Sequence, residues 1–386
     1  MENFTNNINR ITVEDLLESV CKKTNLTDWG SNSFLTPLRM LVESFDTDNS
    51  VKSIQAIYFR NDCIRLLVNR LLAEHYFKNV PEIETIKISK PIFIVGLGRT
   101  GSTLLHNLLS LDNLSRAVLY WEMLRPAPIL DTEGDESKLR IKLAKEQINA
   151  MYSKLPHLKQ IHELNAEMPE ECHHLLRHTF MSTRFGLHYN VPSYIQWIKS
   201  QDFTYPYEYY KKLLKLILWQ KPGQHLVLKD PLHLDKLNII LKVFPDACII
   251  WTHRNPLTVM PSLCSMRTYS HGQISQEVIE RGVKELAEDT NKALEIRKNY
   301  LNKRQFYDVF YEDLIKNPVQ VIKDIYMHFD YSYDISFEAS ILNWLKENPQ
   351  HKHGKHNYCL EQFGLDEKYI RGCFKGYIDS IKRYDT

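Results

Sequence analysis

Residues 91–112 read PIFIVGLGRTGSTLLHNLLSLD and predict a strand, a tight loop and a helix in succession. Apolar and β-branched residues come first, then Gly96, Gly98 and Gly101, then leucines at helical spacing. Glycines let backbone N–H groups close around phosphate oxygens, and the positive end of the following helix dipole faces them. The segment therefore indicates an anion-binding loop, with a glycine turn that binds nothing as the alternative.

The loop is similar to the Walker A motif G-x-x-x-x-G-K-[ST], with one change at its key position. Gly96 to Thr103 fits the pattern, except that Ser102 stands where a lysine must reach the β- and γ-phosphates of ATP. The positive charge lies instead at Arg99, inside the loop. We therefore predict a phosphate-binding loop that is poorly suited to ATP hydrolysis.

The composition is that of a globular enzyme. Of the 386 residues, 43% are hydrophobic, and the formal net charge of +2 comes without any basic block of the kind that binds nucleic acid. No apolar run approaches the ~18 residues of a membrane span, and the N-terminus lacks the apolar segment of a leader peptide. The seven cysteines are dispersed without a C-x-x-C pair. We expect a cytoplasmic enzyme with reduced thiols, no transmembrane segment and no nucleic-acid partner.

Residues 1–88 carry apolar residues at helical spacing and predict a helical N-terminal extension. Its arginines at positions 60, 65 and 70 are expected on a solvated face, because charges on a predicted helix usually lie there. The pattern ends at Asn79-Val80-Pro81, a helix-breaking sequence. We therefore expect a domain boundary near residue 88.

Residues 89–386 alternate strands with helices, which predicts an α/β domain built on a P-loop-type doubly wound parallel sheet flanked by helices. The expected strands include PIFIVG, HLVLKD (225–230), ACIIWTH (247–253) and FYDVFY (306–311). Ligands of such sheets collect at the carboxyl ends of the strands, where the motifs LGRTG, LKDP, THRNP and FYED fall. The sequence thus places four candidate motifs at one edge.

A second anion site is predicted after the strand that ends in WTH. Arg254 follows that strand, and Ser262 lies about two turns into the next helix. An arginine, a hydroxyl and a helix N-terminus together can hold a phosphate. Two phosphate sites on one edge imply a ligand that is phosphorylated at two separated places.

From Pro91 onward the chain resembles the sulfotransferases that use 3′-phosphoadenosine 5′-phosphosulfate (PAPS), especially the bacterial branch with an N-terminal helical extension. GLGRTGSTLL resembles the 5′-phosphosulfate loop of this family, THRNPLTVMPS its 3′-phosphate motif, and VFYEDL its strand beside the adenine. WEMLRPAP, MPEECHHLL and VLKDPLHL are also similar to the bacterial branch. Cytosolic members acting on small phenols usually carry Lys and Trp where this chain has Arg99 and Leu104, so it is closer to tyrosylprotein-type and bacterial members.

The resemblance implies a donor site for PAPS that requires no metal. The glycine loop would hold the 5′-phosphosulfate of the donor. Arg254 and Ser262 would hold the 3′-phosphate, and Lys355 of a basic C-terminal loop would also touch it. Tyr311 would lie near the adenine. The loop residues implied in this role are Gly98, Arg99, Thr100, Gly101, Ser102 and Thr103.

Sulfuryl transfer resembles phosphoryl transfer, because an in-line displacement needs charge stabilisation on the leaving phosphate and a base at the acceptor hydroxyl. Arg99 and Lys229 are the candidates for charge stabilisation. Glu122, 23 residues after Arg99, is the first candidate base, and His233 is the second. Structural alternatives remain open: Lys229 paired with Asp230, Glu122 paired with Arg125, and a buried structural histidine at 233.

A helix is also expected from about Glu167. On it Glu170, His174 and His178 would share one face through i,i+4 steps, which makes a metal site geometrically possible. No second group of ligands has matching spacing, so we expect no metal here. Glu171 or His173 is a further candidate base.

Two other functions are compatible with the motifs. A P-loop kinase or NTPase would need Mg²⁺ and the Walker lysine, and Ser102 argues against it. A non-catalytic nucleotide-binding scaffold would bind the donor without turnover. The leading prediction is a PAPS-dependent sulfotransferase acting on an acceptor hydroxyl, whose identity and oligomeric state the sequence leaves open.

Overall fold

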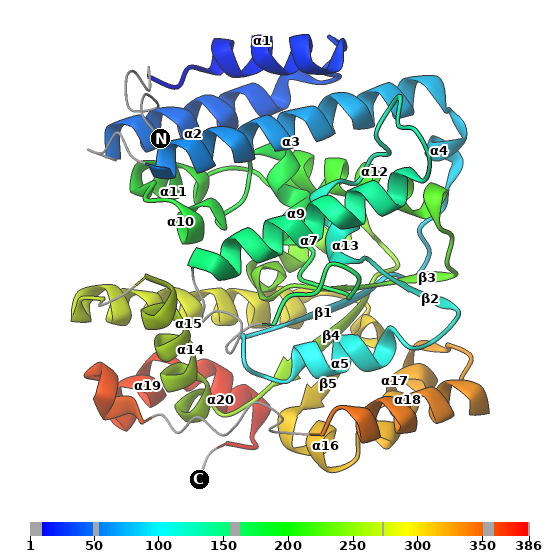
Figure 1. Cartoon of the computed structure of the whole chain (residues 1–386). Coiled ribbons are helices and arrows are strands. Elements are labelled where there is room, and N and C mark those ends of the chain that lie inside the picture. Colours follow the sequence, from blue (N-terminus) through cyan, green and yellow to red (C-terminus); the bar gives the residue numbers. More distant parts are fainter. Residues whose placement is uncertain (1–9, 49–53, 155–162, 272–273, 350–358, 385–386) are drawn as a thin grey trace. The chain divides into compact units, whose positions relative to one another are not determined.

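The computed structural model of the chain describes residues 10–48, 54–154, 163–271, 274–349 and 359–384, which form two compact units (Figure 1). Unit 1 comprises Met1–Lys87, Trp121–Lys142 and Cys172–Pro222, and unit 2 comprises Ile88–Tyr120, Leu143–Glu171 and Gly223–Thr386. The first crossing between them, at Lys87–Ile88, falls beside the boundary expected near residue 88. Whether the N-terminal extension is a domain of its own stays a prediction, because unit 1 also takes in two later segments.

The described part of unit 1 is helical. Its elements are α1 (Val13–Thr24), η1 (Asn32–Phe34), α2 (Leu35–Asp48), α3 (Ile54–Asn79), α4 (Glu82–Thr85), most of α6 (Tyr120–Leu124), α9 (His173–Leu176), η2 (Arg177–Thr179), α10 (Phe185–His188), α11 (Pro192–Ile198) and α12 (Thr204–Gln220). The helix α7 (Glu136–Lys154) belongs partly to each unit.

Local sequence explains how α1 forms. Thr12 caps its N-terminus by accepting a hydrogen bond from the Asp15 N–H, and Asn25 ends it in the left-handed conformation that asparagine tolerates. Leu16 and Val20 are buried, whereas the charged side chains of α1 lie at the surface. An amphipathic helix of this kind is stabilised by the apolar face that it buries.

Arg70 corrects the prediction of a solvated arginine face in the extension. Its side chain is completely buried, with the guanidinium carbon 4.3 Å from the ring centre of Phe34 and 4.5 Å from that of Tyr209. It donates hydrogen bonds to the backbone carbonyls of Trp29 and Ser31. The prediction was wrong here because a guanidinium can be buried when aromatic faces and carbonyl oxygens replace its water.

Unit 2 is organised around a parallel sheet, as predicted; it has five strands in the order β2-β3-β1-β4-β5. The strands are β1 (Ile92–Gly96), β2 (Ser115–Ala117), β3 (His225–Lys229), β4 (Cys248–His253) and β5 (Phe306–Phe310). The register pairs Ile94 with Lys229 and Gly96 with Thr252. The carboxyl ends of β1, β3 and β4 therefore meet at one edge, with β5 beside β4.

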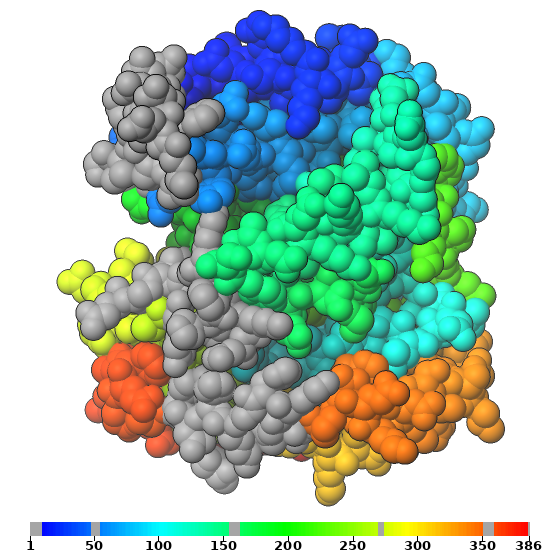
Figure 2. All heavy atoms as spheres, in the orientation of Figure 1, coloured from blue at the N-terminus to red at the C-terminus, as the bar shows by residue number. Residues whose placement is uncertain are grey.

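Helices cover both faces of this sheet (Figure 1). The helices that lie wholly in unit 2 are α5 (Ser102–Leu109), α13 (Leu237–Val243), α14 (Pro256–His271), α15 (Gln276–Asn299), α16 (Tyr311–Lys316), α17 (Pro318–Phe329), α18 (Ile335–Glu347), α19 (Glu367–Cys373) and α20 (Lys375–Ile381), with the short helices η3 (Pro231–Lys236), η4 (Lys303–Gln305) and η5 (Leu360–Phe363). α18 lies in the outer layer, in orange in Figure 2.

Every residue of β1, β3 and β4 is buried, which is the expected state of a parallel sheet covered on both faces. One core cluster joins Ile92, Ile94 and Ile250 of the sheet to leucines of α5 and to residues of α17 and α18. On the opposite face Phe93 contacts Phe244, and Trp251 lies against Tyr377 of α20. Burial of these apolar side chains away from water stabilises the sheet, and the sheet in turn holds the strand ends in place.

The helix expected from about Glu167 is shorter than predicted. It begins at His173 as α9 and is followed by the 3₁₀ turn η2, so Glu170 and His178 are not on one helix with His174. The i,i+4 face that would have made a metal site geometrically possible at these residues is therefore not formed. No described helix is both long and apolar enough to cross a bilayer.

Candidate active site

The loop between β1 and α5 depends on backbone conformations that few residues adopt. Gly96 has φ of 132°, and a Cβ there would lie 2.5 Å from the carbonyl oxygen of Thr252 on the neighbouring strand. Gly101 has φ of 85° and precedes α5, and a Cβ there would come within 3.1 Å of the Tyr311 ring. Arg99 has φ of 69°, which is costly for a residue with a Cβ. Strain of this kind is concentrated at functional sites.

The side chains of the loop divide into internal supports and exposed groups. The Thr100 hydroxyl is buried, donates to the Leu97 carbonyl over 2.6 Å and lies 2.6 Å from the Thr252 hydroxyl. It therefore braces the loop, and only the backbone of Thr100 remains for a ligand. Arg99 and Thr103 are exposed, whereas Gly98 is partly buried.

The helix α5 begins without a side-chain cap. Gly101 at the N-cap has no side chain to accept the first N–H groups, and Ser102 and Thr103 open the helix. Because the first N–H groups of a helix lack intrahelical partners and carry its positive dipole end, this terminus is suited to an anion. Ser102 is buried at the position of the Walker lysine.

Three sequence motifs converge around Arg99 in unit 2. Its Nε donates to the Ser262 hydroxyl over 3.2 Å, and its backbone carbonyl accepts a hydrogen bond of 2.9 Å from Nη1 of Arg254. The guanidinium of Arg254 lies 3.9 Å from the ring centre of Tyr311. Tyr311 is the first residue of α16 and not part of the preceding strand. Sequence analysis singled out all four residues, and the fold brings them together.

A hydrogen-bonded network next to Arg254, with a buried histidine and tyrosine at its centre, was missed by sequence reasoning. His253, the last residue of β4, has Nε2 2.8 Å from Asp308 and Nδ1 2.9 Å from the Tyr377 hydroxyl. Arg297 contacts both carboxylate oxygens of Asp308, at 2.5 and 2.8 Å. Burial lowers the pKa of His253, although Asp308 acts in the opposite direction. The aspartate within the otherwise apolar and aromatic FYDVFY was the only sequence signal of this network.

Lys229 lies at the end of β3 among carboxylates. Its Nζ is 3.2 Å from Glu171 Oε1 and 3.9 Å from Glu170 Oε1, and only 2% of its side chain is exposed. Burial acts to lower the Lys229 pKa, but Glu171, Glu170 and Asp230 together outweigh it and raise the pKa. Lys229 is therefore held as an ammonium ion. Asp230 was the ion-pair partner of Lys229 considered from sequence. Its carboxylate caps η3 by accepting a hydrogen bond from the Leu232 N–H.

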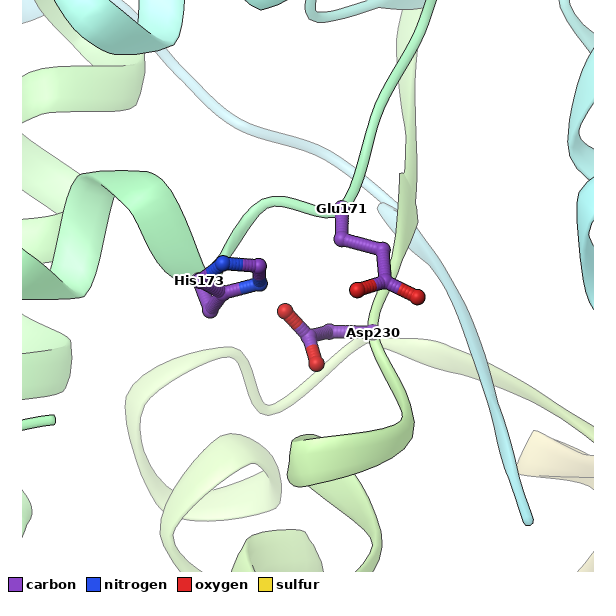
Figure 3. A group of neighbouring side chains, drawn as sticks. All are labelled: Glu171, His173 and Asp230. Atoms are coloured by element: carbon purple, nitrogen blue, oxygen red, sulfur yellow. The ribbon is translucent and has the colours of Figure 1, made fainter. Parts of the chain in front are cut away.

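The carboxylates of Glu171 and Asp230 lie close together at this strand end (Figure 3), with oxygen atoms within 4.8 Å of each other. Paired carboxylates are potential ligands for a hard cation. The ammonium of Lys229 already supplies positive charge at Glu171, however, so the pair has a cation from the chain itself. His173, also drawn in Figure 3, belongs to unit 1.

The candidate bases have different environments. His233 lies in η3, is completely buried and has its ring centre 5.4 Å from that of Phe93. Burial lowers its pKa against the opposing effect of Asp230 and two other carboxylates. Glu122 lies in α6 and is buried in unit 1. Lys355 falls outside the described residues.

Residues 91–334 match the model of the sulfotransferase family. The chain belongs to this family. Its members are enzymes that transfer a sulfuryl group and use PAPS as the donor. This sulfotransferase is 24% identical over 300 residues to the omega-hydroxy-beta-dihydromenaquinone-9 sulfotransferases Stf3 of Mycobacterium tuberculosis and Mycobacterium bovis, a match that covers 74% of this chain and 74% of each relative.

Solved sulfotransferase structures have the same fold. STF1 of Mycobacterium tuberculosis superposes with a TM-score of 0.77 at 27% identity, covering 95% of this chain and 99% of that one. STF9 of Mycobacterium avium superposes with a TM-score of 0.84 at 23% identity, covering 98% of each chain. The second likeness concerns the fold alone. Sulfuryl transfer by an α/β enzyme with N-terminal helices, as predicted from sequence, is thereby confirmed, and the kinase alternative has no support.

Proposed function

We propose that this sulfotransferase moves the sulfuryl group of PAPS to an acceptor hydroxyl, with the donor lying along the carboxyl edge of the unit 2 sheet. The observation that carries the proposal is the link from Ser262 to Arg99 and from Arg99 to Arg254, which joins the two predicted phosphate motifs. A donor phosphorylated at two separated places matches that pair of motifs. ATP lacks the 3′-phosphate that the second motif would recognise.

The two ends of the donor are assigned by the chemistry of each motif. The N-terminus of α5, the loop backbone from Gly98 to Ser102 and the exposed side chains of Arg99 and Thr103 would hold the 5′-phosphosulfate. Arg254 and Ser262 would hold the 3′-phosphate, joined by Lys355. Tyr311 would form a wall of the adenosine site, with Arg254 stacked on its ring.

The reaction is an in-line displacement at sulfur. The acceptor oxygen forms a new S–O bond while the bond between sulfur and the bridging phosphate oxygen breaks, which releases 3′-phosphoadenosine 5′-phosphate. Negative charge grows on the departing phosphate, and we assign its stabilisation to Arg99 and Lys229. Lys229 is suited to this task because its neighbouring carboxylates keep it protonated despite burial.

The acceptor proton passes to a base, for which we propose Glu122 or His233. The lowered pKa of His233 keeps its imidazole neutral and able to accept a proton near pH 7. Glu122, the other candidate base, is a buried carboxylate in unit 1. Comparing the pH–rate profiles of the Glu122→Gln and His233→Gln variants distinguishes the two candidate bases, because loss of the true base removes the rise in rate with pH.

The experiment that tests the function measures binding and transfer with the full chain. We expect 3′-phosphoadenosine 5′-phosphate to stabilise the protein against heat, and ATP with Mg²⁺ to have no such effect. Radiolabelled PAPS incubated with the enzyme and a cell extract should label acceptor molecules in wild type and not in Arg99→Ala. Stabilisation by ATP with Mg²⁺ alone would contradict the proposal, and donor binding without any labelled product would favour a scaffold.

The acceptor class can be narrowed by the relatives. The mycobacterial Stf3 proteins are named for omega-hydroxy-beta-dihydromenaquinone-9, which is a hydroxylated quinone. Hydroxylated quinones are therefore the first acceptors to supply in the labelling experiment.

A further inference from the structure

The C-terminal residues 375–384 contact both segments that carry the proposed adenosine 3′-phosphate site. Tyr377 of α20 reaches His253, next to Arg254, while Arg383 and Tyr384 reach the start of α16 beside Tyr311. All of these residues belong to unit 2. The segment has no part in the chemistry assigned above, so its contacts call for a separate explanation.

The first contact fixes the residue before Arg254. The pKa of Asp308 is well below its usual range through its hydrogen bonds to His253 and Arg297, which outweigh its burial, so its carboxylate only accepts hydrogen bonds. Nε2 of His253 must therefore carry the proton that points to Asp308. Since burial keeps His253 neutral, Nδ1 is the acceptor, and the Tyr377 hydroxyl donates to it over 2.9 Å.

Tyr377 is also linked to Arg254 directly. The Arg254 backbone acts to lower the pKa of the Tyr377 hydroxyl, against the larger effect of burial, and 1% of Tyr377 is exposed to solvent. A buried hydroxyl that is hydrogen-bonded to His253, the last residue of β4, restricts the backbone from which the next side chain, Arg254, projects. The position of that guanidinium is therefore tied to α20.

The second contact fixes the residues around Tyr311. Arg383 binds both carboxylate oxygens of Asp313, at 2.6 and 2.8 Å, and its guanidinium lies 4.3 Å from the ring centre of Phe310. The Tyr384 hydroxyl donates to Glu312 over 3.0 Å. The residues on either side of Tyr311 are thus held by the last described residues of the chain.

We propose that residues 375–384 act as a positioning element of the donor site, in which Tyr377 gives selectivity for a nucleotide with a 3′-phosphate and Arg383 with Tyr384 supports the adenosine wall. By fixing Arg254 through Tyr377 and Tyr311 through Arg383 and Tyr384, the segment holds both groups in place before the nucleotide arrives. Preorganisation of this kind raises affinity because less order must be imposed on binding. The proposal rests on the proposed function, which assigns Arg254 to the 3′-phosphate.

The test compares two nucleotides that differ only in the 3′-phosphate. Calorimetric titration of the full chain with 3′-phosphoadenosine 5′-phosphate and with adenosine 5′-monophosphate gives a selectivity ratio for each variant. Tyr377→Phe removes one hydroxyl and should lower this ratio about fivefold, the typical effect of one hydrogen bond. The affinity for adenosine 5′-monophosphate, which lacks the 3′-phosphate, should stay as in wild type.

A double-mutant cycle establishes that Tyr377 acts through Arg254. In an Arg254→Ala background, Tyr377→Phe should cause no further loss of selectivity, because the group that it positions is gone. Asp379→Asn is the matched control on the same helix, since Asp379 is exposed and pairs with Lys375 of α20. This control should leave the ratio unchanged.

Arg383→Ala tests the second contact, near Tyr311. It provides an independent test if the Tyr377 variant folds poorly. It should lower affinity for both nucleotides about equally, because Tyr311 would serve the adenosine that they share, and Arg383→Lys should restore part of that affinity. An unchanged ratio in Tyr377→Phe, or equal losses for both nucleotides in that variant, would overturn the inference. Failure of the wild-type protein to prefer the 3′-phosphorylated nucleotide would instead overturn the proposed function.

Discussion

The Nε of Arg99 donates a hydrogen bond to the Ser262 hydroxyl over 3.2 Å, although the two residues are 163 positions apart in the chain. This contact connects the loop proposed for the 5′-phosphosulfate to the motif proposed for the 3′-phosphate. A serine hydroxyl can accept from Arg99 and still donate to a phosphate oxygen. Arg99 of the first motif and Ser262 of the second motif therefore hold each other in position.

Replacing Arg99 with alanine should reduce transfer more than nucleotide binding, because its proposed task is to stabilise the charge that grows on the leaving phosphate in the transition state. Removal of one group that stabilises transition-state charge lowers kcat by about 10²–10³-fold. The affinity for 3′-phosphoadenosine 5′-phosphate should fall less, because the loop backbone, Arg254 and Ser262 would also hold this product. Single-turnover rates with PAPS and calorimetry with the product check this, with Arg99→Lys as the variant that keeps the charge. Equal losses in both measurements would make Arg99 a binding residue.

Replacing Gly96 with alanine should destabilise the protein by more than about 2 kcal/mol, because a clash adds to backbone strain. The new Cβ would lie 2.5 Å from the Thr252 carbonyl oxygen. Gly134→Ala is the matched control: Gly134 also has positive φ, at 84°, but its Cβ would meet nothing within 4 Å. The control should cost only about 1 kcal/mol, the penalty of the left-handed conformation. Urea unfolding measures both, and similar costs would argue against the close approach of β1 to β4.

Replacing Lys229 with methionine should abolish transfer and destabilise the fold by about 3–5 kcal/mol, because carboxylates would be left at a buried position without their ammonium partner. Adding Glu171→Gln to this variant should recover part of the stability and none of the activity. Lys138→Met, at an exposed ion pair with Asp135, is the control and should change stability little. A Lys229→Met protein as stable as wild type would contradict the buried ion pair.

Acid should weaken the fold through His106, whose pKa is lowered to about 3 by burial and by the nearby charge of Lys229, against the opposing effects of Glu170 and Glu171. The unfolded chain binds this proton near pH 6.5 and the native chain does not, so stability falls as pH drops from about 6.5 toward 3.

This one group contributes a loss of ~1.4 kcal/mol per pH unit below its unfolded pKa. His106→Gln keeps a donor for the Val227 carbonyl and does not titrate, so its urea midpoint should depend less steeply on pH between 7 and 5. Parallel slopes for the variant and wild type would count against a neutral buried His106.

Local sequence determined the elements that carry the chemistry. The apolar runs ending at Gly96, Lys229 and His253 became the buried strands β1, β3 and β4, because a short β-branched run covered on both faces has few other stable states. The glycine spacing predicted the loop because only glycine adopts the positive φ of positions 96 and 101 without strain. Family motifs then identified Arg99, Ser262, Arg254 and Tyr311 together.

Tertiary structure decided which distant polar and charged groups meet. Glu171 contacts Lys229 across 58 positions, Tyr377 contacts His253 across 124, and Arg70 is buried between aromatic rings where its helical pattern predicted solvent. No local propensity encodes such partners, because each buried charge is tolerated only when a segment far along the chain supplies its counter-charge or hydrogen bond. The sequence by itself therefore determined the strands, the glycine loop and the family, while packing of the assembled sheet and helices determined how Arg254, Lys229 and Arg70 are held.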